Sequence, residues 1–444
     1  MPVTEITSFF IRRYLDDNYA KPENFWPGLI DFKDSFIRHF HSIPAGSPIL
    51  VSGDWGVGKT SFLQVVKAEL TSSGHTCVWF DAWRYEYEEG LLPALIRKVW
   101  EDAITIKGDD EEILGTCLKA AVMLGVRSIP AMLNVLSGGF LSGMFNGFNA
   151  SSMDKELKSL TYSPQESPTD ILRKEFGKLT KKASRHNKPL VIFIDDLDRC
   201  NPESAIQLLD HIRQLINVVS VDEEKNITYR FVIAMDKTTL KDAVALKYAE
   251  INKYDSNRYL EKLFPFSFTL PVLQQQEIND FIARQSENLN LNSGSMGYIY
   301  GYSRNNINQL FANVMIREYF SNPRLIKRCI NRFYMLCQCE NQFSDKPGDI
   351  KSPDESELNR MIIWLAAIER WPPLRKALLT KPTSFWLEML KAVKGMSTIT
   401  DEVGQNLLLY RGFKIFFQQH FATDTKEIVR HFQQIEQRLC LHGL

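Results

Sequence analysis

The chain has 444 residues, of which 44% are hydrophobic and 24% are charged. Such a composition excludes a largely disordered protein, and the length allows two or three domains with hydrophobic cores of their own. Lysine plus arginine and aspartate plus glutamate both number 53, so the net charge is zero. A balanced charge gives no sign of the strongly basic surface that marks many nucleic-acid-binding proteins, although a local basic patch stays open.

The cysteine content and the first residues indicate a cytoplasmic protein. Seven cysteines, an odd number, are scattered along the chain, which fits a reducing compartment. The first twenty residues contain acidic side chains and no long apolar core, so they do not match a secretory signal. We therefore expect a cytoplasmic location. Residues 128–153, described below, also allow association with a membrane.

The amino-terminal part of the chain predicts a helical lead-in followed by the start of an α/β domain. Residues 1–47 look helical, with phenylalanine and isoleucine at helical spacing. A strand is predicted at residues 48–52, an amphipathic helix at 60–70 and a second strand at 77–80. This alternation favours a mainly parallel sheet with helices on both faces.

Three further buried strands are predicted in the middle of the chain. Residues 190–194, 229–235 and 264–270 are short apolar runs, rich in valine, isoleucine or phenylalanine and bounded by polar residues. We therefore predict a three-layer α/β domain over residues 48–271, with a mainly parallel sheet at its centre.

The rest of the chain predicts helices. Residues 272–340 contain several amphipathic helical patterns, and residues 357–444 again have apolar side chains at helical core spacing. Between them, residues 341–356 are polar and contain prolines and a glycine, which predicts a loop or linker. This division predicts a helical domain at 272–340 and a C-terminal helical region at 357–444.

A long insertion, at about residues 105–168, separates the second and third predicted strands. Its middle, residues 128–153, contains no aspartate, glutamate, lysine or arginine. About 20 apolar residues can cross a bilayer, but asparagines, glycines and serines interrupt this segment. A glycine-rich packed insertion or partner surface is the first interpretation. A hairpin that touches or enters a membrane is the second, and simple disorder is the third.

Residues 53–60, GDWGVGKT, match the phosphate-binding pattern G-x-x-x-x-G-K-[ST] in full. The glycines let the backbone curl so that its N–H groups meet phosphate oxygens, and the following helix presents further N–H donors. Lys59 supplies a positive charge for the β- and γ-phosphates, and the Thr60 hydroxyl is the expected magnesium ligand. The predicted nucleotide-binding residues are Gly53, Asp54, Trp55, Gly56, Val57, Gly58, Lys59, Thr60 and Ser61.

A pair of carboxylates follows the predicted strand at 190–194, in the sequence LVIFIDDLDRC. Parallel strands share their carboxyl edge, so these side chains should lie beside the phosphate-binding loop. We assign Asp195 to magnesium and Asp196 to orienting or deprotonating the attacking water, in chemistry that depends on positioning and electrostatic stabilisation. Asp198 is expected to cap a helix or to bond Arg199.

Two arginines are candidates for stabilising transition-state charge, Arg258 and Arg324. Arg324 is preferred because it starts a helix in the domain that follows the sheet, and a helix-surface salt bridge is the alternative for both. Asp236, after the strand at 229–235, is either a sensor of the γ-phosphate or an ordinary loop residue. The predicted catalytic residues are Lys59, Asp196 and Arg324.

Five segments in chain order carry a family resemblance. They are GDWGVGKTSFL at residue 53, FDAWRYE at 80, IDDLDRCNPESAIQLLDHIR at 194, YLEKLFPFSFTLP at 259 and NPRLIKRCINRF at 322. Together they resemble the KAP family of P-loop NTPases, bacterial and animal ATPases with an insertion in the nucleotide domain. The resemblance covers about residues 30–335, and five motifs in order are far more specific than one.

The resemblance implies a three-layer P-loop NTPase domain with a helical domain behind it. It implies that the insertion is the family's variable element, often membrane-spanning, although residues 128–153 form a single short segment. Trp83 and Glu86, in FDAWRYE, would lie near the shared face of the nucleotide domain. Bacterial relatives are often associated with exclusion of bacteriophage, so a role in anti-phage defence, with an effector protein encoded separately, is expected by analogy.

Two functions are consistent with these residues. The first is an ATPase that binds and hydrolyses ATP with Mg²⁺ to switch or power a multi-protein assembly, with homo-oligomerisation and stimulation by nucleic acid left open. The second is a non-hydrolysing, nucleotide-bound scaffold that recruits partners or a membrane surface. The paired carboxylates favour the first, since binding alone needs no Asp196. Nothing resembles a guanine-specific motif, so ATP is expected rather than GTP.

Overall fold

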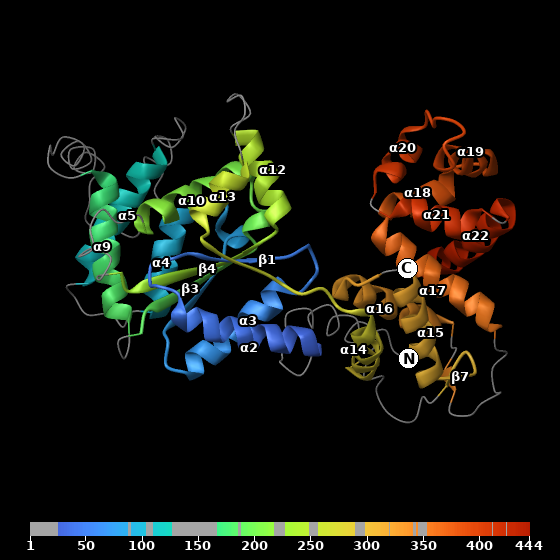
Figure 1. Ribbon diagram of the computed structural model, residues 1–444, viewed down its shortest axis with the longest axis horizontal. Helices are drawn as coiled ribbons and strands as arrows, with labels where there is room; N and C mark the ends of the chain where they lie inside the picture. Colours follow the sequence, from blue (N-terminus) through green and yellow to red (C-terminus); the bar gives the residue numbers. More distant parts are fainter. Residues whose placement is uncertain are drawn as a thin grey trace.

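Five parallel strands form the centre of the structure, a computed structural model of the chain (Figure 1). In sheet order they are β2 (Cys77–Asp81), β3 (Leu190–Asp195), β4 (Tyr229–Met235), β1 (Ile49–Ser52) and β5 (Phe266–Thr269). All neighbouring pairs are parallel, so the carboxyl ends of the strands lie along one edge. The structure describes residues 25–87, 90–103, 110–126, 167–184, 188–216, 227–247, 256–288, 298–318, 320–340, 343–344, 353–410, 412–422 and 424–444.

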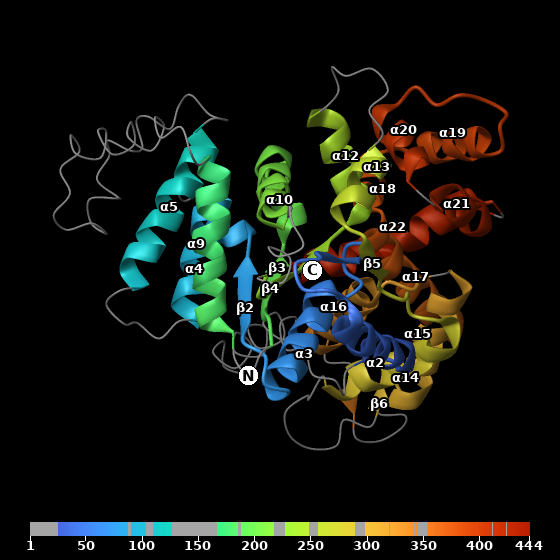
Figure 2. The ribbon, with the colours of Figure 1, turned by 60° about the vertical axis from the view of Figure 1, so that its left-hand side comes forward.

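Side chains on the two faces of the sheet enter two separate hydrophobic cores, because successive strand residues point to opposite faces. Ile49 and Val51 belong to one core, and Leu50 belongs to the other. The helices of the first core next to the sheet are α2 (Pro27–Ser42) and α3 (Lys59–Ser72). Those of the second are α4 (Leu91–Ala103), α5 (Asp110–Val126), α9 (Pro168–Ala183), α10 (Pro202–Ile216), α12 (Lys237–Lys247) and α13 (Ser256–Leu263). Figure 2 shows both groups beside the strands, which confirms the predicted three-layer arrangement.

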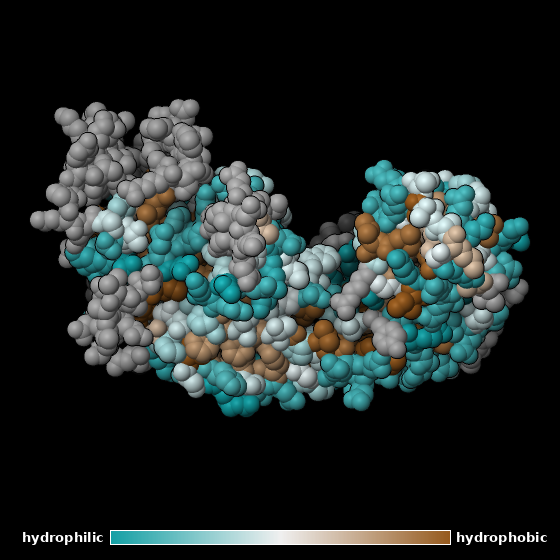
Figure 3. Space-filling view, turned by 45° about the horizontal axis from the view of Figure 1, so that its top comes forward, coloured by the Kyte–Doolittle hydropathy of each residue, from teal (hydrophilic) through white to brown (hydrophobic). Residues whose placement is uncertain are grey.

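After β5 the chain is mainly helical. The helices are α14 (Gln275–Asn288), α15 (Arg304–Arg317), α16 (Pro323–Cys339), α17 (Glu355–Arg370), α18 (Pro372–Thr380), α19 (Thr383–Val393), α20 (Glu402–Leu409), α21 (Phe413–Phe421) and α22 (Thr425–Leu441). In the space-filling view, a hollow in the surface separates the sheet-based part from the C-terminal helices (Figure 3). The first hydrophobic core continues from α2 and α3 into these helices, so the two parts share packed side chains.

Three two-residue strands differ from the sequence prediction. β6 (Tyr298–Ile299), β7 (Tyr302–Ser303) and β8 (Phe343–Ser344) form a small antiparallel sheet. We expected only helices over residues 272–340 and a loop or linker at 341–356. Strands of two residues are too short to produce an alternating pattern, which is why the sequence did not indicate them.

The five predicted strands of the main sheet are present with small differences at their ends, and the helix predicted at 60–70 is α3. The prediction that the strand at 264–270 is buried is wrong, because β5 lies at the edge of the sheet and its four residues are exposed or half-buried. The domain boundaries stay predictions. Residues 1–24 of the helical lead-in lie outside the described residues, as does the uncharged segment 128–153 of the insertion. Among the residues that are described, no helix combines the length and the apolar character that crossing a membrane requires.

Candidate active site

The loop between β1 and α3 turns through left-handed backbone at two glycines. Gly56 has a φ of +88° and Gly58 a φ of +95°, values that favour a residue without a Cβ. A Cβ at Gly56 would also lie 2.8 Å from Asn322 Oδ1 and 2.9 Å from the Arg324 Cβ. Gly58 is the N-cap of α3, whose first backbone N–H groups have no partner within the helix. The loop therefore provides free N–H donors for an anion.

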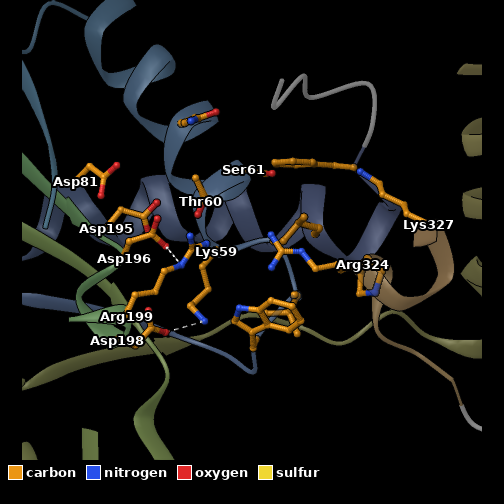
Figure 4. A pocket seen from close by; sticks show the side chains of 18 of the residues that line it. Lys59, Thr60, Ser61, Asp81, Asp195, Asp196, Asp198, Arg199, Arg324 and Lys327 are labelled. Carbon is orange, nitrogen blue, oxygen red and sulfur yellow. Dashed lines mark ion pairs between the residues drawn. The ribbon is translucent and has the colours of Figure 1, made fainter. Parts of the chain in front are cut away.

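A cavity of about 450 Å³ lies beside this loop, at the carboxyl ends of β2 and β3 (Figure 4). Its size falls within the roughly 300–1,000 Å³ typical of small-molecule sites. The loop and the start of α3 contribute Trp55, Gly56, Val57, Gly58, Lys59, Thr60 and Ser61. The other lining residues are Phe25, Trp26, Leu29, Gln64, Trp79, Asp81, Trp83, Asp195, Asp196, Asp198, Arg199, Phe281, Pro323, Arg324 and Lys327.

Lys59 is surrounded by oxygen atoms. Its Nζ donates to the carbonyl oxygens of Gly53, at 2.9 Å, and of Asp54, at 3.4 Å. The same nitrogen lies 3.5 Å from Asp198 Oδ2. Gly53 and Asp54, predicted to bind nucleotide, do not line the cavity and contact Lys59 instead. The ammonium group is therefore held in the cavity wall by partners that a polyphosphate can replace.

Thr60, at the start of α3, and Asp195, at the end of β3, both line the cavity, and the Thr60 hydroxyl favours the charged form of the Asp195 carboxylate. Asp195 is only 3% exposed. Burial, and then the negative charge of Asp196, raise the pKa of Asp195 to about 6. Hydroxyl and carboxylate oxygens are ligands that Mg²⁺ prefers, and a divalent cation would favour the charged carboxylate. Thr60 and Asp195 therefore fit a magnesium ion.

Asp196 adopts an uncommon backbone conformation at the end of β3. Its φ is +55°, a left-handed value that aspartate and asparagine tolerate better than most residues. Its Oδ1 lies 2.9 Å from Arg199 Nε. Burial raises the pKa of Asp196, and the charge of Arg199 opposes this shift. Figure 4 shows Asp196 with Asp195 on the opposite side of the cavity from Arg324.

The expectation that Asp198 caps a helix or bonds Arg199 is wrong. The Asp198 carboxylate pairs with Lys59 and accepts the backbone N–H of Asp236 at 3.1 Å, whereas Arg199 pairs with Asp196. The left-handed turn at Asp196 redirects the chain between the two aspartates, which residue spacing alone does not reveal. Asp198 thus holds Lys59 and ties β3 to the end of β4.

The first turn of α16 contacts the phosphate-binding loop directly. The Arg324 guanidinium lies over the Trp55 ring, 4.5 Å from its centroid. The Nδ2 of Asn322 donates to the Trp55 carbonyl at 2.8 Å, while its Oδ1 accepts the N–H of Arg324 and so caps α16. The loop and the helical region are therefore joined at one point by a hydrogen bond and a cation–π contact.

The other two candidates of the sequence lie elsewhere. Arg258, on α13, does not line the cavity. Asp236 does not line it either, and its Oδ1 accepts the backbone N–H of Thr238 at 2.8 Å at the start of α12. Asp236 thus fits the ordinary loop residue rather than the sensor.

Several lining residues were missed by the sequence prediction. Asp81 ends β2 directly opposite Asp195. An acidic residue at the end of a predicted strand was the sequence signal that could have identified it. Lys327 lies one helical turn after Arg324 on α16, so helical spacing could have found it. Arg199 had no such signal, because its pairing depends on the turn that precedes it.

The FDAWRYE segment reaches the cavity through its tryptophan. Trp83 lines the cavity, is 50% exposed, and has the Arg199 guanidinium 5.8 Å from its ring centroid. Glu86 does not line it, and its carboxylate accepts the backbone N–H of Asn201. This contact holds the segment against the turn that follows β3.

Individual proteins that are similar to this chain are distant from it in sequence. An uncharacterised protein of Methanocaldococcus jannaschii is 26% identical over 185 residues, which cover 36% of this chain and 93% of that protein. The Aeropyrum pernix ORC2 protein, solved in ADPNP–ADP complexes, has a TM-score of 0.43 and 13% identity, covering 96% of this chain and 98% of its own. The Aeropyrum pernix ORC1 protein in complex with DNA has a TM-score of 0.38 and 14% identity, covering 94% and 82%. TM-scores this low support no inference about the site.

A protein-family model also matches most of the chain. Residues 35–338 match the KAP family P-loop domain, from α2 through the strands of the main sheet to α16. This range contains all of the predicted site residues, from Gly53 to Arg324. Because the match covers well over half of the sequence, the chain belongs to the KAP family of P-loop NTPases.

Proposed function

We propose that this protein binds ATP with Mg²⁺ and hydrolyses it. The observation that supports this most directly is the convergence of Lys59, Thr60, Asp195 and Asp196 on one cavity beside a glycine-rich loop. Pure nucleotide binding needs the first three. The fourth is a partly buried carboxylate one residue beyond the magnesium ligand, where hydrolysis needs a group to position water.

Each residue has a distinct role in this mechanism. The loop N–H groups and the Lys59 ammonium bind the phosphates, with Lys59 exchanging its contacts to Gly53 and Asp198 for phosphate oxygens. Thr60 and Asp195 would hold a magnesium ion, and bound magnesium would supply positive charge beside the phosphates. Asp196 orients or deprotonates the attacking water, and Arg324 stabilises negative charge from the opposite side of the cavity.

The contact between α16 and the loop suggests how hydrolysis switches an assembly. Arg324 and Asn322 belong to the helical region, yet they touch the residue at the centre of the loop. A γ-phosphate that attracts the Arg324 guanidinium would strengthen the hold of α16 on the loop, and hydrolysis would weaken it. We propose that a separately encoded effector, or a second copy of the chain, reads this change, and that nucleic acid acts at most as a stimulator.

Multiple-turnover phosphate release by the purified chain tests the function. We expect slow release that requires Mg²⁺ and is abolished by Lys59→Ala, which should also lose nucleotide binding because the main phosphate-binding cation is gone. Binding of ATP without any release by the wild type would favour the non-hydrolysing scaffold. Turnover by Lys59→Ala at the wild-type rate would place the chemistry in another site.

Replacing Arg324 with alanine should lower turnover by about 10- to 100-fold while ATP affinity changes by only a few fold. The reason is that the guanidinium approaches the site from the helical region and would matter most when charge develops. Arg258→Ala is the control, since Arg258 does not line the cavity. If Arg324→Ala had unchanged turnover, Arg324 would have no role in hydrolysis and would serve only to stack on Trp55.

Anti-phage defence is the cellular role that we propose from family membership alone. Plaque counts on cells that express the wild type or Lys59→Ala would test it, since equal protection would exclude a nucleotide-dependent role. Membrane contact through residues 128–153 stays a separate prediction, to be tested by flotation of the purified chain with lipid vesicles.

A further inference from the structure

The side chain of Arg199 lines the cavity beside the groups proposed to act on ATP. Arg199 ends a single turn of 3-10 helix, η5 (Leu197–Arg199), whose N-cap is Asp196. Residues three apart in such a turn lie one above the other, so the Arg199 side chain returns to Asp196. Its Nε lies 2.9 Å from Asp196 Oδ1. Arg199 is thus attached to the carboxylate that is proposed to act on the attacking water.

This contact uses only one edge of the Arg199 guanidinium. A guanidinium has five N–H donors, and the Nε of Arg199 is the nitrogen that pairs with Asp196. Among the described residues, its two terminal nitrogens have no hydrogen-bond or ion-pair partner. The side chain is 39% exposed, so an atom of a ligand in the cavity can reach these nitrogens. The unused edge therefore offers N–H donors that suit an anion.

Trp83 supports the guanidinium from another direction. The Arg199 Cζ lies 5.8 Å from the centroid of the Trp83 ring, within the range of a cation–π contact. Glu86, three residues after Trp83, accepts the backbone N–H of Asn201, two residues after Arg199. The segment after β2 and the turn after β3 are therefore joined around the arginine. Such support limits the positions of the guanidinium, as a preorganised contact to a ligand requires.

The charges that line the cavity are unevenly placed. The carboxylates follow β2 and β3, as Arg199 does, whereas Arg324 and Lys327 belong to α16 on the opposite side (Figure 4). A phosphate group beside the carboxylates would be repelled by them. Arg199 supplies positive charge on their own side of the cavity, and it can do so without any movement of α16.

We propose that Arg199 is a further catalytic residue, which holds Asp196 with its Nε and binds the γ-phosphate of ATP with its terminal nitrogens. This inference rests on the proposed function and deepens it. A guanidinium can contact two oxygen-bearing groups at once because its donors point outward from a rigid plane.

The two contacts would act together in hydrolysis. The oxygen of a water molecule bonds to the γ-phosphorus while the bond from phosphorus to the bridging oxygen breaks. ADP leaves with that electron pair, inorganic phosphate forms, and one water proton passes to Asp196. Because Arg199 touches both groups, it sets the carboxylate in a fixed position relative to the phosphorus and stabilises negative charge on the phosphoryl oxygens.

A contact to the γ-phosphate should distinguish ATP from ADP, which lacks that group. The test measures binding of ADP and of the non-hydrolysable analogue AMP-PNP to the full chain with Mg²⁺ by titration calorimetry. Phosphate release from ATP is measured on the same proteins. For Arg199→Ala we expect about 100-fold slower release, about tenfold weaker binding of the analogue, and ADP binding within about twofold of the wild type.

Arg199→Lys separates the charge from the geometry. Lysine keeps the positive charge but has one compact ammonium group, which cannot hold two groups from two edges. Binding of the analogue should therefore stay within a few fold of the wild type, while phosphate release should remain at least about tenfold slower. Arg213→Ala is the matched control, since Arg213 lies at an exposed position of α10 and does not line the cavity.

Two results for Arg199→Ala would overturn the inference. One is phosphate release at the wild-type rate, and the other is parallel loss of the analogue and ADP, as expected of a residue that only supports the turn. If Arg199→Ala fails to fold, release at the wild-type rate by Arg199→Lys would overturn the two-sided contact.

Failure of the proposed function would be seen in the wild type itself. A wild type that binds neither nucleotide would remove that function and the role of Arg199 with it. A wild type that binds both without releasing phosphate would remove hydrolysis alone. The comparison of the analogue with ADP would then still decide whether Arg199 binds the γ-phosphate.

Discussion

Replacing Asp196 with asparagine should leave ATP affinity close to that of the wild type and slow turnover by about 100-fold or more. Asp196 lines the cavity beside Asp195, the proposed magnesium ligand, and its pKa is raised by burial. A carboxylate in that position can accept a proton from water, whereas an amide cannot. Binding should survive, because the groups assigned to the phosphates and to magnesium are unchanged.

Asparagine is the informative substitution at this position. It keeps the size of the side chain, an oxygen that accepts from Arg199, and tolerance of the left-handed φ of 55°. Alanine would add backbone strain, so a lost rate would have two explanations. Asp242→Asn, at an exposed position of α12, is the control for the loss of one negative charge. Phosphate release at the wild-type rate by Asp196→Asn would exclude Asp196 as the residue that activates water.

The central sheet and the phosphate-binding loop were predictable because their signals are local. β3 is a continuous apolar run, as expected of a parallel sheet covered on both faces, and it ends in the acids that reach the cavity. β4 is apolar apart from Arg230. The loop motif fixes the position of Gly58, whose left-handed φ only glycine adopts without strain. Each of these signals can therefore be read within a few consecutive residues.

The parts of the site that the sequence did not reveal depend on contacts between distant segments. Trp26 meets Phe281, and Asn322 bonds to Trp55, across more than two hundred residues of chain in each case. No periodicity or spacing encodes such a pairing. The prediction that Asp198 bonds Arg199 failed for a different reason. Arg199 pairs with Asp196 and Asp198 pairs with Lys59, and this arrangement depends on the left-handed φ of Asp196.

Replacing Asp195 with asparagine should raise the thermal midpoint of the ligand-free protein at neutral pH. The Asp195 carboxylate is buried beside a second carboxylate, so its pKa rises from 3.8 to about 6. A shift of about two units corresponds to roughly 3 kcal/mol by which the folded state disfavours the charged form. Asparagine removes that charge while keeping an oxygen near the Thr60 hydroxyl.

The gain should depend on pH in a defined direction. Because the folded pKa of Asp195 lies above its unfolded value, folding takes up a proton between the two values. The wild type therefore loses stability as the pH rises from about 4 to about 6, and the loss is complete above that window. The difference between Asp195→Asn and the wild type should be small near pH 4 and largest above about pH 6. Thermal unfolding in a chelating buffer across this range measures it, with Asp242→Asn as the control.

Addition of ATP with Mg²⁺ should reverse the order of the two proteins. A divalent cation held by Thr60 and Asp195 neutralises the carboxylate repulsion and binds only the folded state, so the wild-type midpoint rises with ligand concentration. Asp195→Asn has lost the charged ligand and should gain much less. A substitution that merely improved packing would help equally with and without ligand. If the ligand-free midpoint of Asp195→Asn fell instead, the carboxylate would be a structural partner of Thr60 rather than a group kept for a metal ion at the expense of stability.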